Sequence, residues 1–387
     1  MAILNNNNRI TFGSFLAYFV MSAIISPLGV ISAPVAEHFQ ISLTAANASF
    51  TWLTSGVFIG TLIAVFIFDY IRLRQVVIGG VAVICLSLYA IYAVDSFQVF
   101  TLCLGLIGVS CGVELSAAAV VIAKIYDEKL RASMLLLTDS FYSMAGVIST
   151  TLAGMFLARQ FHWSSAYFLA FFVALGIATI ALLSRYPETG SAAAKATQDA
   201  GKRRWPLSVH FIGLSMLVYL VAFVMIYSWV PNYAQQALGL SVEVSSEIVS
   251  RLFLGMFIGQ LCMFVLVLKF PVPALVVVCA SAATLLTASL WLVQSGAQLQ
   301  LAMFGLGLAT GGLFKTVLSY GTTAVSEPSP KMVSYLIFHA GLGTAIAPFV
   351  GSLIVEQFSI VAALQFVTIA YALTLGLILV ALWQRRR

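Results

Sequence analysis

The chain has 387 residues, of which 61% are hydrophobic and only 8% are charged. A soluble domain of this length would carry about a quarter charged residues, so this composition excludes a water-soluble protein and indicates an integral membrane protein. The net charge of +6 is explained by basic residues near the membrane surface, and it implies neither nucleic acid nor an acidic substrate as a partner.

Twelve apolar stretches follow one another along the chain, separated by polar and charged residues. Each is about long enough to cross ~30 Å of hydrocarbon as a helix, and no alternating strand pattern is present. We therefore predict an all-α membrane protein with twelve transmembrane helices. The expected spans are 10–33, 45–68, 75–94, 98–123, 133–157, 163–184, 207–230, 246–268, 272–293, 300–323, 332–354 and 361–383.

The distribution of basic residues predicts the orientation of these spans. An even number of spans places both termini on the same side of the membrane. If that side is the cytoplasm, 16 of the 19 Lys and Arg residues lie at the inner face, and the opposite topology leaves one there. The positive-inside rule therefore predicts cytoplasmic termini. The N-terminal sequence MAILNNNNRI shows no signal-peptide cleavage pattern.

The longest connection, 185–206, lies close to the middle of the chain and is rich in Ala, Ser and Thr. We interpret it as a cytoplasmic linker between an N-terminal six-helix half, 1–184, and a C-terminal six-helix half, 207–387. Glycine-rich runs that begin at Gly105-Leu106 and Gly305-Leu306 suggest that the halves are related. On this register Glu114 corresponds to Phe314.

The chain shows no arrangement of residues typical of an enzyme. The five cysteines lie inside expected spans without metal-ligand spacing, and the four histidines are scattered. A phosphate-binding Gly-x-x-x-x-Gly-Lys motif is absent, which excludes ATP as the energy source. We expect no catalytic residue, no metal site and no cofactor.

Glu114 and Lys315 are each the only ionisable residue well inside a long apolar segment. A charge at bilayer depth costs several kcal/mol, so such residues usually face a protein interior or a water-filled cavity. Glu114 has three interpretations: a protonatable coupling carboxyl, a salt bridge to Lys315, or a packing residue hydrogen-bonded within its own half. Lys315 could contact an anionic substrate, pair with Glu114 or Asp139, or be a neutral or snorkelling lysine.

Polar residues at helical spacing form stripes on three expected spans, and such stripes point inward because lipid cannot satisfy them. Helix 7 adds Tyr219, Tyr227 and Trp229, which form either a wall of a cavity or, for the last two, part of an interfacial aromatic belt. The stripes are Ser14, Tyr18, Ser22 and Ser26; Asp139, Ser143, Gly146 and Thr150; and Gly311, Lys315, Ser319 and Thr322.

Three further residues have a functional and a structural interpretation. Asp139 is either a proton-coupling residue or a tie to Arg131 or the end of helix 4. Arg251 is a substrate contact, a gating ion pair or a snorkelling residue. His339 is a satisfied core histidine or a proton relay, because imidazole titrates near neutrality.

Twelve spans, a central linker and weakly repeated halves resemble the major facilitator superfamily. The stretch VFIFDYIRLRQ (65–75) partly matches the charged loop between helices 2 and 3 of that family, through Asp69 and Arg74. Val65 stands where the motif has its first glycine. The resemblance implies that Asp69, Arg72 and Arg74 form a cytoplasmic gate, and ordinary positive-inside charge is the alternative.

Three segments, TDSFYSMAG (138–146), EPSPKMVSYL (327–336) and VGSLIVE (350–356), resemble the TsgA-type branch, which is allied to the fucose–proton symporters. GVELSAAA (112–119) is similar to the helix 4 motif of those symporters and implies that Glu114 takes part in proton coupling. The acidic residue of helix 1 in that group is missing here. The resemblance also implies that helices 1, 4, 7 and 10 line the central cavity.

We therefore predict a monomeric secondary transporter of the inner membrane that moves a small polar or anionic solute by alternating access, coupled to protons. Glu114 and Asp139 are the candidates for proton coupling. An exporter of metabolites or toxic compounds and a transport-inactive sensor or scaffold are the alternatives. The candidate solute-binding residues are Lys315, Tyr18, Ser22, Ser319, Tyr219, Arg251 and His339.

Overall fold

The computed structural model describes residues 5–188, 205–293, 295–323 and 330–386. Its elements are α-helices and short 3-10 helices within these ranges, and twelve helices there are long and apolar enough to cross a membrane. The expected all-α, twelve-span architecture is confirmed. The chain divides into two compact units, Met1–Ser191 and Ala192–Arg387. Residues 189–204 of the expected linker lie outside the described residues.

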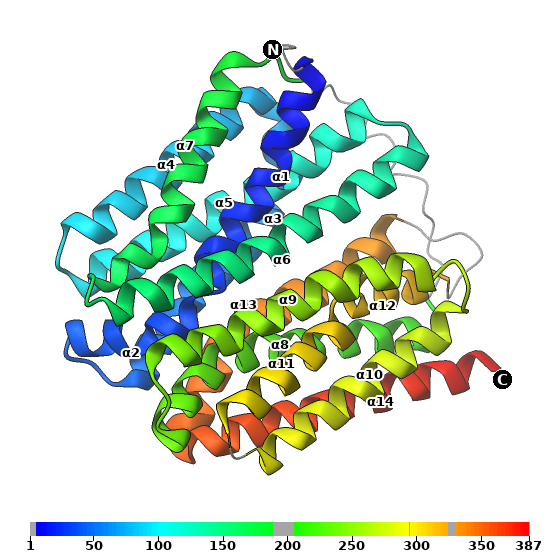
Figure 1. Ribbon diagram of the computed structural model, residues 1–387. Coiled ribbons are helices and arrows are strands. Elements are labelled where there is room, and N and C mark those ends of the chain that lie inside the picture. Colours follow the sequence, from blue (N-terminus) through cyan, green and yellow to red (C-terminus); the bar gives the residue numbers. More distant parts are fainter. Residues whose placement is uncertain (1–4, 189–204, 294, 324–329, 387) are drawn as a thin grey trace. The chain divides into compact units, whose positions relative to one another are not determined.

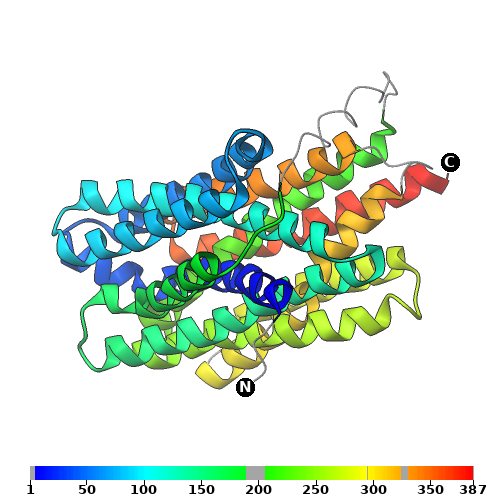
Figure 2. The same ribbon diagram turned by 90° about the horizontal axis from the view of Figure 1, so that it is seen from above.

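The first unit contains seven α-helices that lie side by side (Figures 1 and 2). Its first expected span is divided in two, because Pro27 lacks the N–H that would donate to the carbonyl of Ala23. The elements are α1 (Asn6–Ile25), α2 (Leu28–His38), α3 (Leu43–Tyr70), α4 (Leu73–Ala93), α5 (Phe97–Ile125), α6 (Glu128–Ala158), the 3-10 helix η1 (Trp163–Tyr167) and α7 (Phe168–Leu183).

The second unit repeats this plan with a break in a different place. The tenth expected span is interrupted at Gly311-Gly312, where two residues without side chains stabilise helix poorly. The elements are α8 (Leu207–Leu238), α9 (Val242–Leu266), α10 (Val272–Ser289), η3 (Leu290–Leu292), α11 (Gly296–Thr310), α12 (Leu313–Thr322), α13 (Pro330–Gln357) and α14 (Ile360–Arg386).

Four glycines allow α3 and α5 to pack backbone against backbone. A methyl group added at Gly56 would lie 2.6 Å from the carbonyl oxygen of Gly105. Methyl groups at Gly60, Gly108 and Gly112 would also overlap backbone carbonyls of the facing helix. Small residues at four-residue spacing permit this close approach, which brings α5 and its Glu114 tightly against α3.

The second unit contains the same seam between α9 and α11. Gly255, Gly259, Gly307 and Gly311 make contacts equivalent to those of Gly56, Gly60, Gly108 and Gly112, and each follows its counterpart by 199 residues. The carbonyl groups that face these glycines follow the same offset. The Leu53 carbonyl faces Gly108, and the Leu252 carbonyl faces Gly307. The units are thus related by an internal repeat.

This offset corrects the register expected from the sequence. The expectation that paired Gly105 with Gly305 and Glu114 with Phe314 is wrong by one residue. Glu114 corresponds to Leu313, and Lys315 corresponds to Ser116.

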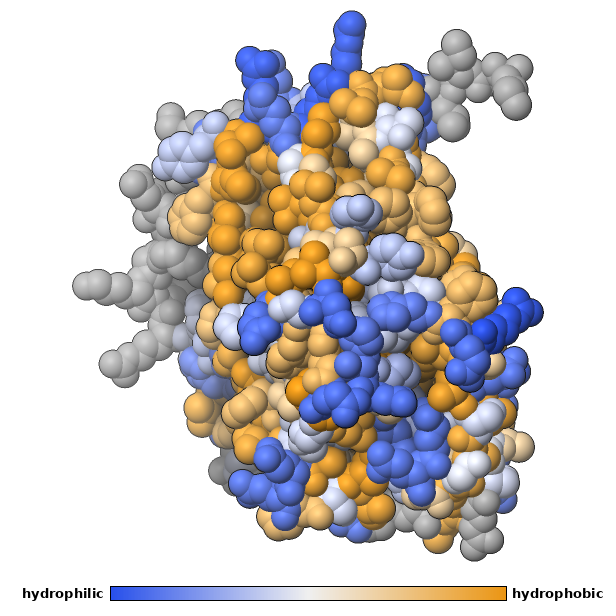
Figure 3. Space-filling view, turned by 90° about the vertical axis from the view of Figure 1, so that its left-hand side faces the viewer, coloured by the Kyte–Doolittle hydropathy of each residue, from blue (hydrophilic) through white to orange (hydrophobic). Residues whose placement is uncertain are grey.

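Large apolar side chains are exposed along several helices, including Leu86, Tyr89 and Tyr92 on α4. Figure 3 shows a face on which apolar side chains form broad areas between patches of hydrophilic residues. Such areas are unusual on a soluble protein and are typical of a surface that contacts lipid acyl chains.

Candidate functional site

The polar stripe on α1 lies inside the first unit. Ser14 donates a hydrogen bond to the carbonyl of Ile10, and Ser26 donates to the carbonyl of Ser22. The hydroxyls of Ser26 and Ser149 on α6 are 2.7 Å apart. Ser14, Ser22 and Ser26 of this stripe are buried, and Tyr18 is half-buried. Ser22 keeps a buried hydroxyl without a partner among the described residues.

Tyr18 and Asp139 come together where α1 packs against α6. A hydrogen bond joins the Tyr18 hydroxyl to the side chain of Thr138, and the charge of Asp139 acts on that hydroxyl. The same carboxylate acts on Tyr142, one turn further along α6. Tyr18, expected to bind solute, and Asp139, expected to bind protons, therefore belong to one polar cluster. We call this cluster, which also contains Thr138 and Tyr142, the Tyr18–Asp139 cluster.

Glu114 lies apart from this cluster, in the middle of α5. Its side chain is 3% exposed, and its Oε1 has no hydrogen-bond partner within the part of the chain that the structure describes. That oxygen lies over Gly80 of α4, where any larger side chain would collide with it. The absence of a side chain at Gly80 therefore creates the space that the carboxyl group occupies.

Tyr186 lines a cavity at one end of the first unit. This end, the near end, carries the start of α1, because Asn6 and Arg185 exchange two hydrogen bonds of 2.8 Å. Burial raises the pKa of Tyr186 above its ordinary value, the negative charge of Glu114 raises it further, and Arg74 opposes both. The charges of Glu114 and Arg74 thus act on the Tyr186 phenol in opposite directions.

The cavity at the near end has a volume of about 560 Å³. Charged side chains of both signs and the Tyr186 ring contribute to its wall. These lining residues are Asp69, Arg72, Arg74, Arg185, Tyr186 and Glu188.

The proposed gate residues Asp69, Arg72 and Arg74 line this cavity, but Arg74 is already engaged. Its Nε donates to the carbonyl of Ala181 at 2.9 Å, and Nη2 donates to the carbonyl of Leu182 at 2.7 Å. These charge-assisted bonds satisfy carbonyls at the C-terminal end of α7 and fix that end to the start of α4. Their role as a gate stays a prediction.

In the second unit, Lys315 and Ser319 lie one turn apart on α12 and are both exposed. The Lys315 ammonium lies 5.6 Å from the centre of the Phe314 ring. Because the break at Gly311-Gly312 precedes them, the two side chains belong to a separate short helix. Lys315, Ser319 and Thr322 of the expected stripe lie together on α12, and Gly311 lies at the break that precedes it.

The aromatic residues of α8 form the core of the second unit. Tyr227 and Trp229 are 1% and 0% exposed, so their interpretation as an interfacial belt is wrong. Tyr227 packs against Phe253, with ring centres 6.0 Å apart. Tyr219 is also buried, and its hydroxyl lies 3.4 Å from the carbonyl of Thr310, at the end of α11.

His339 is half-buried and hydrogen-bonded within α13, and its two interpretations stay predictions. Its Nδ1 donates to the carbonyl of Tyr335 at 2.8 Å, and its ring centre lies 4.3 Å from the Tyr335 ring. The Tyr335 hydroxyl is in turn hydrogen-bonded to His210 of α8. Arg251 on α9 is exposed.

Sequence reasoning missed four residues that shape these sites. Gly80 lies against the Glu114 carboxyl and Tyr186 lines the near-end cavity, and neither has a motif of its own. Arg385 near the C-terminus donates to the carbonyl of Tyr320 at 2.8 Å, and its guanidinium lies 4.0 Å from the centre of that ring. Only the contacts between helices reveal these neighbours.

Comparisons with known proteins agree with this architecture. A model described as Major Facilitator Superfamily matches residues 10–250. The chain is 27% identical over 342 residues to a protein called TsgA homolog from Edwardsiella ictaluri (strain 93-146), covering 88% of this chain and 87% of that protein. A TsgA homolog from Yersinia pestis (strain Pestoides F) is 26% identical over 364 residues, covering 94% and 92%.

Solved structures share the fold at low sequence identity. The nucleoside transporter NupG matches with a TM-score of 0.74 and 14% identity, over 99% of this chain and 100% of that one. The transporter FucP in its outward conformation matches with a TM-score of 0.65 and 15% identity, over 96% and 98%. The human organic anion transporter MFSD10 matches with a TM-score of 0.71 and 13% identity, over 96% and 99%. Because the family model covers well over half of the sequence, the chain belongs to the Major Facilitator Superfamily and is a secondary transporter rather than an enzyme.

Proposed function

We propose that this transporter moves a small polar or anionic solute across the inner membrane and couples that movement to protons at Glu114. The observation that carries the proposal is a carboxyl group that is 3% exposed and whose Oε1 has no hydrogen-bond partner within the described residues. Desolvation without a cationic partner favours the neutral form of a carboxyl group. Its charge therefore depends on the conformation around it, which is the property that a coupling group requires.

The near-end cavity is the route that we propose for proton exchange between this carboxyl and solution. Tyr186 lines the cavity, and the charge of Glu114 acts on its phenol. A phenol hydroxyl can accept one proton and donate another, so it can pass protons between a buried acid and water. If the termini are cytoplasmic, as the basic residues predict, this route opens to the cytoplasm.

The solute class follows from the polar groups that the units present inside the membrane. The Tyr18–Asp139 cluster offers hydroxyl and carboxylate groups, and Lys315 with Ser319 offers a cation and a hydroxyl. Nucleosides, organic anions and sugars form a suitable test panel, because similar structures carry the first two names and the sequence resembles sugar symporters. Contacts from Ser22, Tyr219, Arg251 and His339 remain part of the proposal.

The first experiment identifies a solute. Purified protein is heated with each member of the panel, and a ligand that binds the folded state raises the melting temperature by mass action. The protein is then reconstituted into vesicles that contain a pH-sensitive dye. A gradient of the stabilising solute should acidify the compartment that the solute enters. Alkalinisation of that compartment would identify solute–proton exchange and overturn symport.

Two variants then test Glu114. Glu114→Gln keeps the shape of the side chain and removes its proton exchange, so it should abolish solute-driven pH change while solute binding and counterflow persist. Gly80→Ala places a methyl group where Glu114 Oε1 lies, so it should reduce coupling with the glutamate intact. Gly79→Ala is the matched control, because a methyl group there has no atom within 4 Å. Proton coupling of wild-type size in Glu114→Gln would remove this residue from the mechanism.

A further inference from the structure

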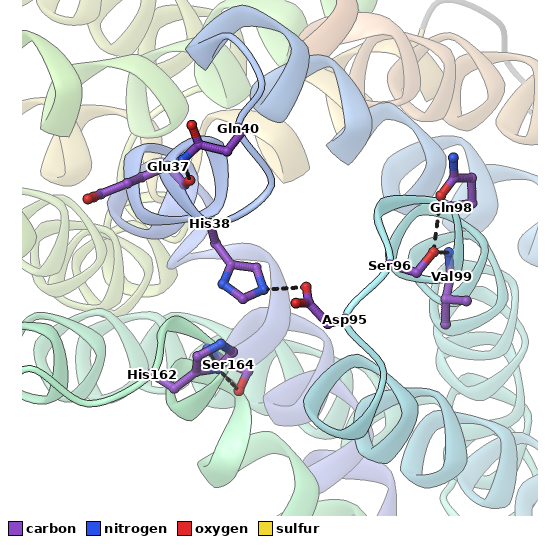
Figure 4. Close-up of polar contacts among 9 residues, drawn as sticks. All are labelled: Glu37, His38, Gln40, Asp95, Ser96, Gln98, Val99, His162 and Ser164. Carbon is purple, nitrogen blue, oxygen red and sulfur yellow. Dashed lines mark hydrogen bonds and ion pairs between the residues drawn. The ribbon is translucent and has the colours of Figure 1, made fainter.

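The first unit has a second end, opposite the near end, which we call the far end. Three ionisable side chains from separate segments meet there. His38 is the last residue of α2, Asp95 lies in the connection between α4 and α5, and His162 precedes η1. His38 Nε2 lies 2.8 Å from Asp95 Oδ1 (Figure 4). The ring centres of His38 and His162 are 5.0 Å apart. We call these three residues the histidine clasp.

The clasp rests on a buried aromatic residue that holds both imidazoles in place. Trp163 is 4% exposed, and its ring centre lies 5.2 Å from that of His162 and 5.7 Å from that of His38. The Phe100 ring of α5 also packs against Trp163, with ring centres 5.3 Å apart. His162 Nδ1 is also hydrogen-bonded to Ser164 Oγ at 2.8 Å. The rings are therefore ordered by packing.

Few other charges reach these rings from the elements that pack around them. Glu37 is the neighbour of His38 on α2, and Figure 4 shows its carboxylate pointing away from the imidazole. Arg159, in the connection that precedes His162, is exposed and forms no ion pair among the described residues. The starts of α3 and α5 present hydroxyl, amide and apolar groups here. Asp95 therefore provides the nearest negative charge to two titratable rings.

We propose that the histidine clasp is a proton-sensitive tie that holds the end of the first span to the two neighbouring connections and releases it when both rings are charged. With one proton, His38 pairs with Asp95 while His162 remains neutral against Trp163. A second proton places two imidazolium rings side by side with one carboxylate to balance them. Like charges at this separation repel, and a charged His162 loses solvation against the indole.

The titration of His162 supports this order. Burial lowers the pKa of His162 below its ordinary value, the charge of His38 lowers it further, and Asp95 opposes both. The folded protein therefore binds a proton at His162 less readily than the unfolded chain does. The contribution of this residue to stability is present above its ordinary pKa and is lost as the pH falls through the lowered value. Acid thus weakens the tie.

This inference is independent of proton coupling at Glu114, because the clasp lies at the far end and Glu114 lies in the middle of α5. If the termini are cytoplasmic, the clasp faces the outside of the inner membrane. Acidification there would free the end of α2, which is the outer part of the first span. The clasp would then adjust the mobility of that span to the outside pH.

The test uses the full-length protein in detergent micelles with isotopically labelled histidine. The chain has four histidines, so four ring signals can be assigned by single substitutions and followed against pH. His38→Gln should raise the titration midpoint of His162 by about 0.5–1 pH unit, because it removes a positive charge about 5 Å away. Asp95→Asn should lower that midpoint. His210 and His339 in the other unit should titrate unchanged and serve as internal controls.

Hydrogen exchange measures the release itself. Exchange rates of residues 36–42, corrected for the intrinsic effect of pH, should increase at least threefold in wild type as both rings charge. His162→Gln should abolish this increase, and His210→Gln should leave it intact. The proposal is overturned if the titration midpoint of His162 fails to shift, or shifts with the opposite sign, in His38→Gln or in Asp95→Asn. It is also overturned if the acid-dependent increase persists in His162→Gln, with thermal unfolding used to verify that each variant is folded.

Discussion

The seam between α3 and α5 makes a quantitative prediction about Gly56. In Gly56→Ala the new methyl group lies 2.6 Å from the Gly105 carbonyl oxygen and 3.0 Å from the Gly108 Cα. All of these neighbours are backbone atoms, so no side chain can move aside. Reaching ordinary contact at 3.4 Å requires the helices to separate by about 0.8 Å. A gap of that size removes a quarter to a half of the dispersion energy of each affected contact.

We therefore expect Gly56→Ala to destabilise the protein by about 1–3 kcal/mol, the range measured for overpacked cores. For a unit of this size about 2 kcal/mol corresponds to a fall in Tm of about 4–8 °C. Gly105→Ala is the matched control, because a methyl group there meets nothing within 4 Å. The alanine should raise Tm slightly, since it favours helix by up to about 1 kcal/mol.

The assay is thermal unfolding of both variants, purified in the same detergent and followed by intrinsic fluorescence. Equal losses of Tm in Gly56→Ala and Gly105→Ala would refute the close approach of the two helices. The α9–α11 seam supplies an independent repeat of the experiment, with Gly307→Ala as the variant that overlaps a backbone carbonyl.

Two further predictions concern topology and the near end of the first unit. In a variant without native cysteines, Ser191→Cys should resist an impermeant thiol reagent in intact cells and react after lysis, and labelling in intact cells would contradict cytoplasmic termini. Arg74→Met should lower stability by about 1–3 kcal/mol, because it removes two charge-assisted bonds to the carbonyls of Ala181 and Leu182. Arg72→Met should change Tm little, since the Arg72 side chain makes no such bond to a helix end among the described residues, and equal effects of the two variants would contradict this assignment.

The sequence determined the membrane-spanning architecture because backbone hydrogen bonds must be satisfied within each segment in lipid. Hydrophobicity is therefore a local signal, and twelve spans could be read from it. The burial of Glu114 was predictable for the same reason, since a lone carboxyl in an apolar segment avoids lipid. The inward stripe on α1 followed from helical spacing alone.

Local signals were less reliable for breaks and for repeats. Pro27 and the pair Gly311-Gly312 lie within long apolar segments, and composition alone does not distinguish a tolerated interruption from a break. The repeat was visible as glycine-rich runs, but its register was wrong by one residue. The 199-residue offset emerges only from the carbonyl that each glycine approaches on the facing helix.

The tertiary structure alone decided which side chains are neighbours across helices. Trp229 was expected in a cavity wall or in an interfacial belt from its position in the sequence, and packing within its unit excluded the belt. Gly80 gained importance from its position against Glu114, and Tyr186 from its place in the wall of the near-end cavity. The histidine clasp joins the end of α2 to residues of two connections that are far apart in the sequence. Its chemistry depends on distances between rings, which helical periodicity does not encode, because it describes each helix separately and says nothing of the helix that packs against it.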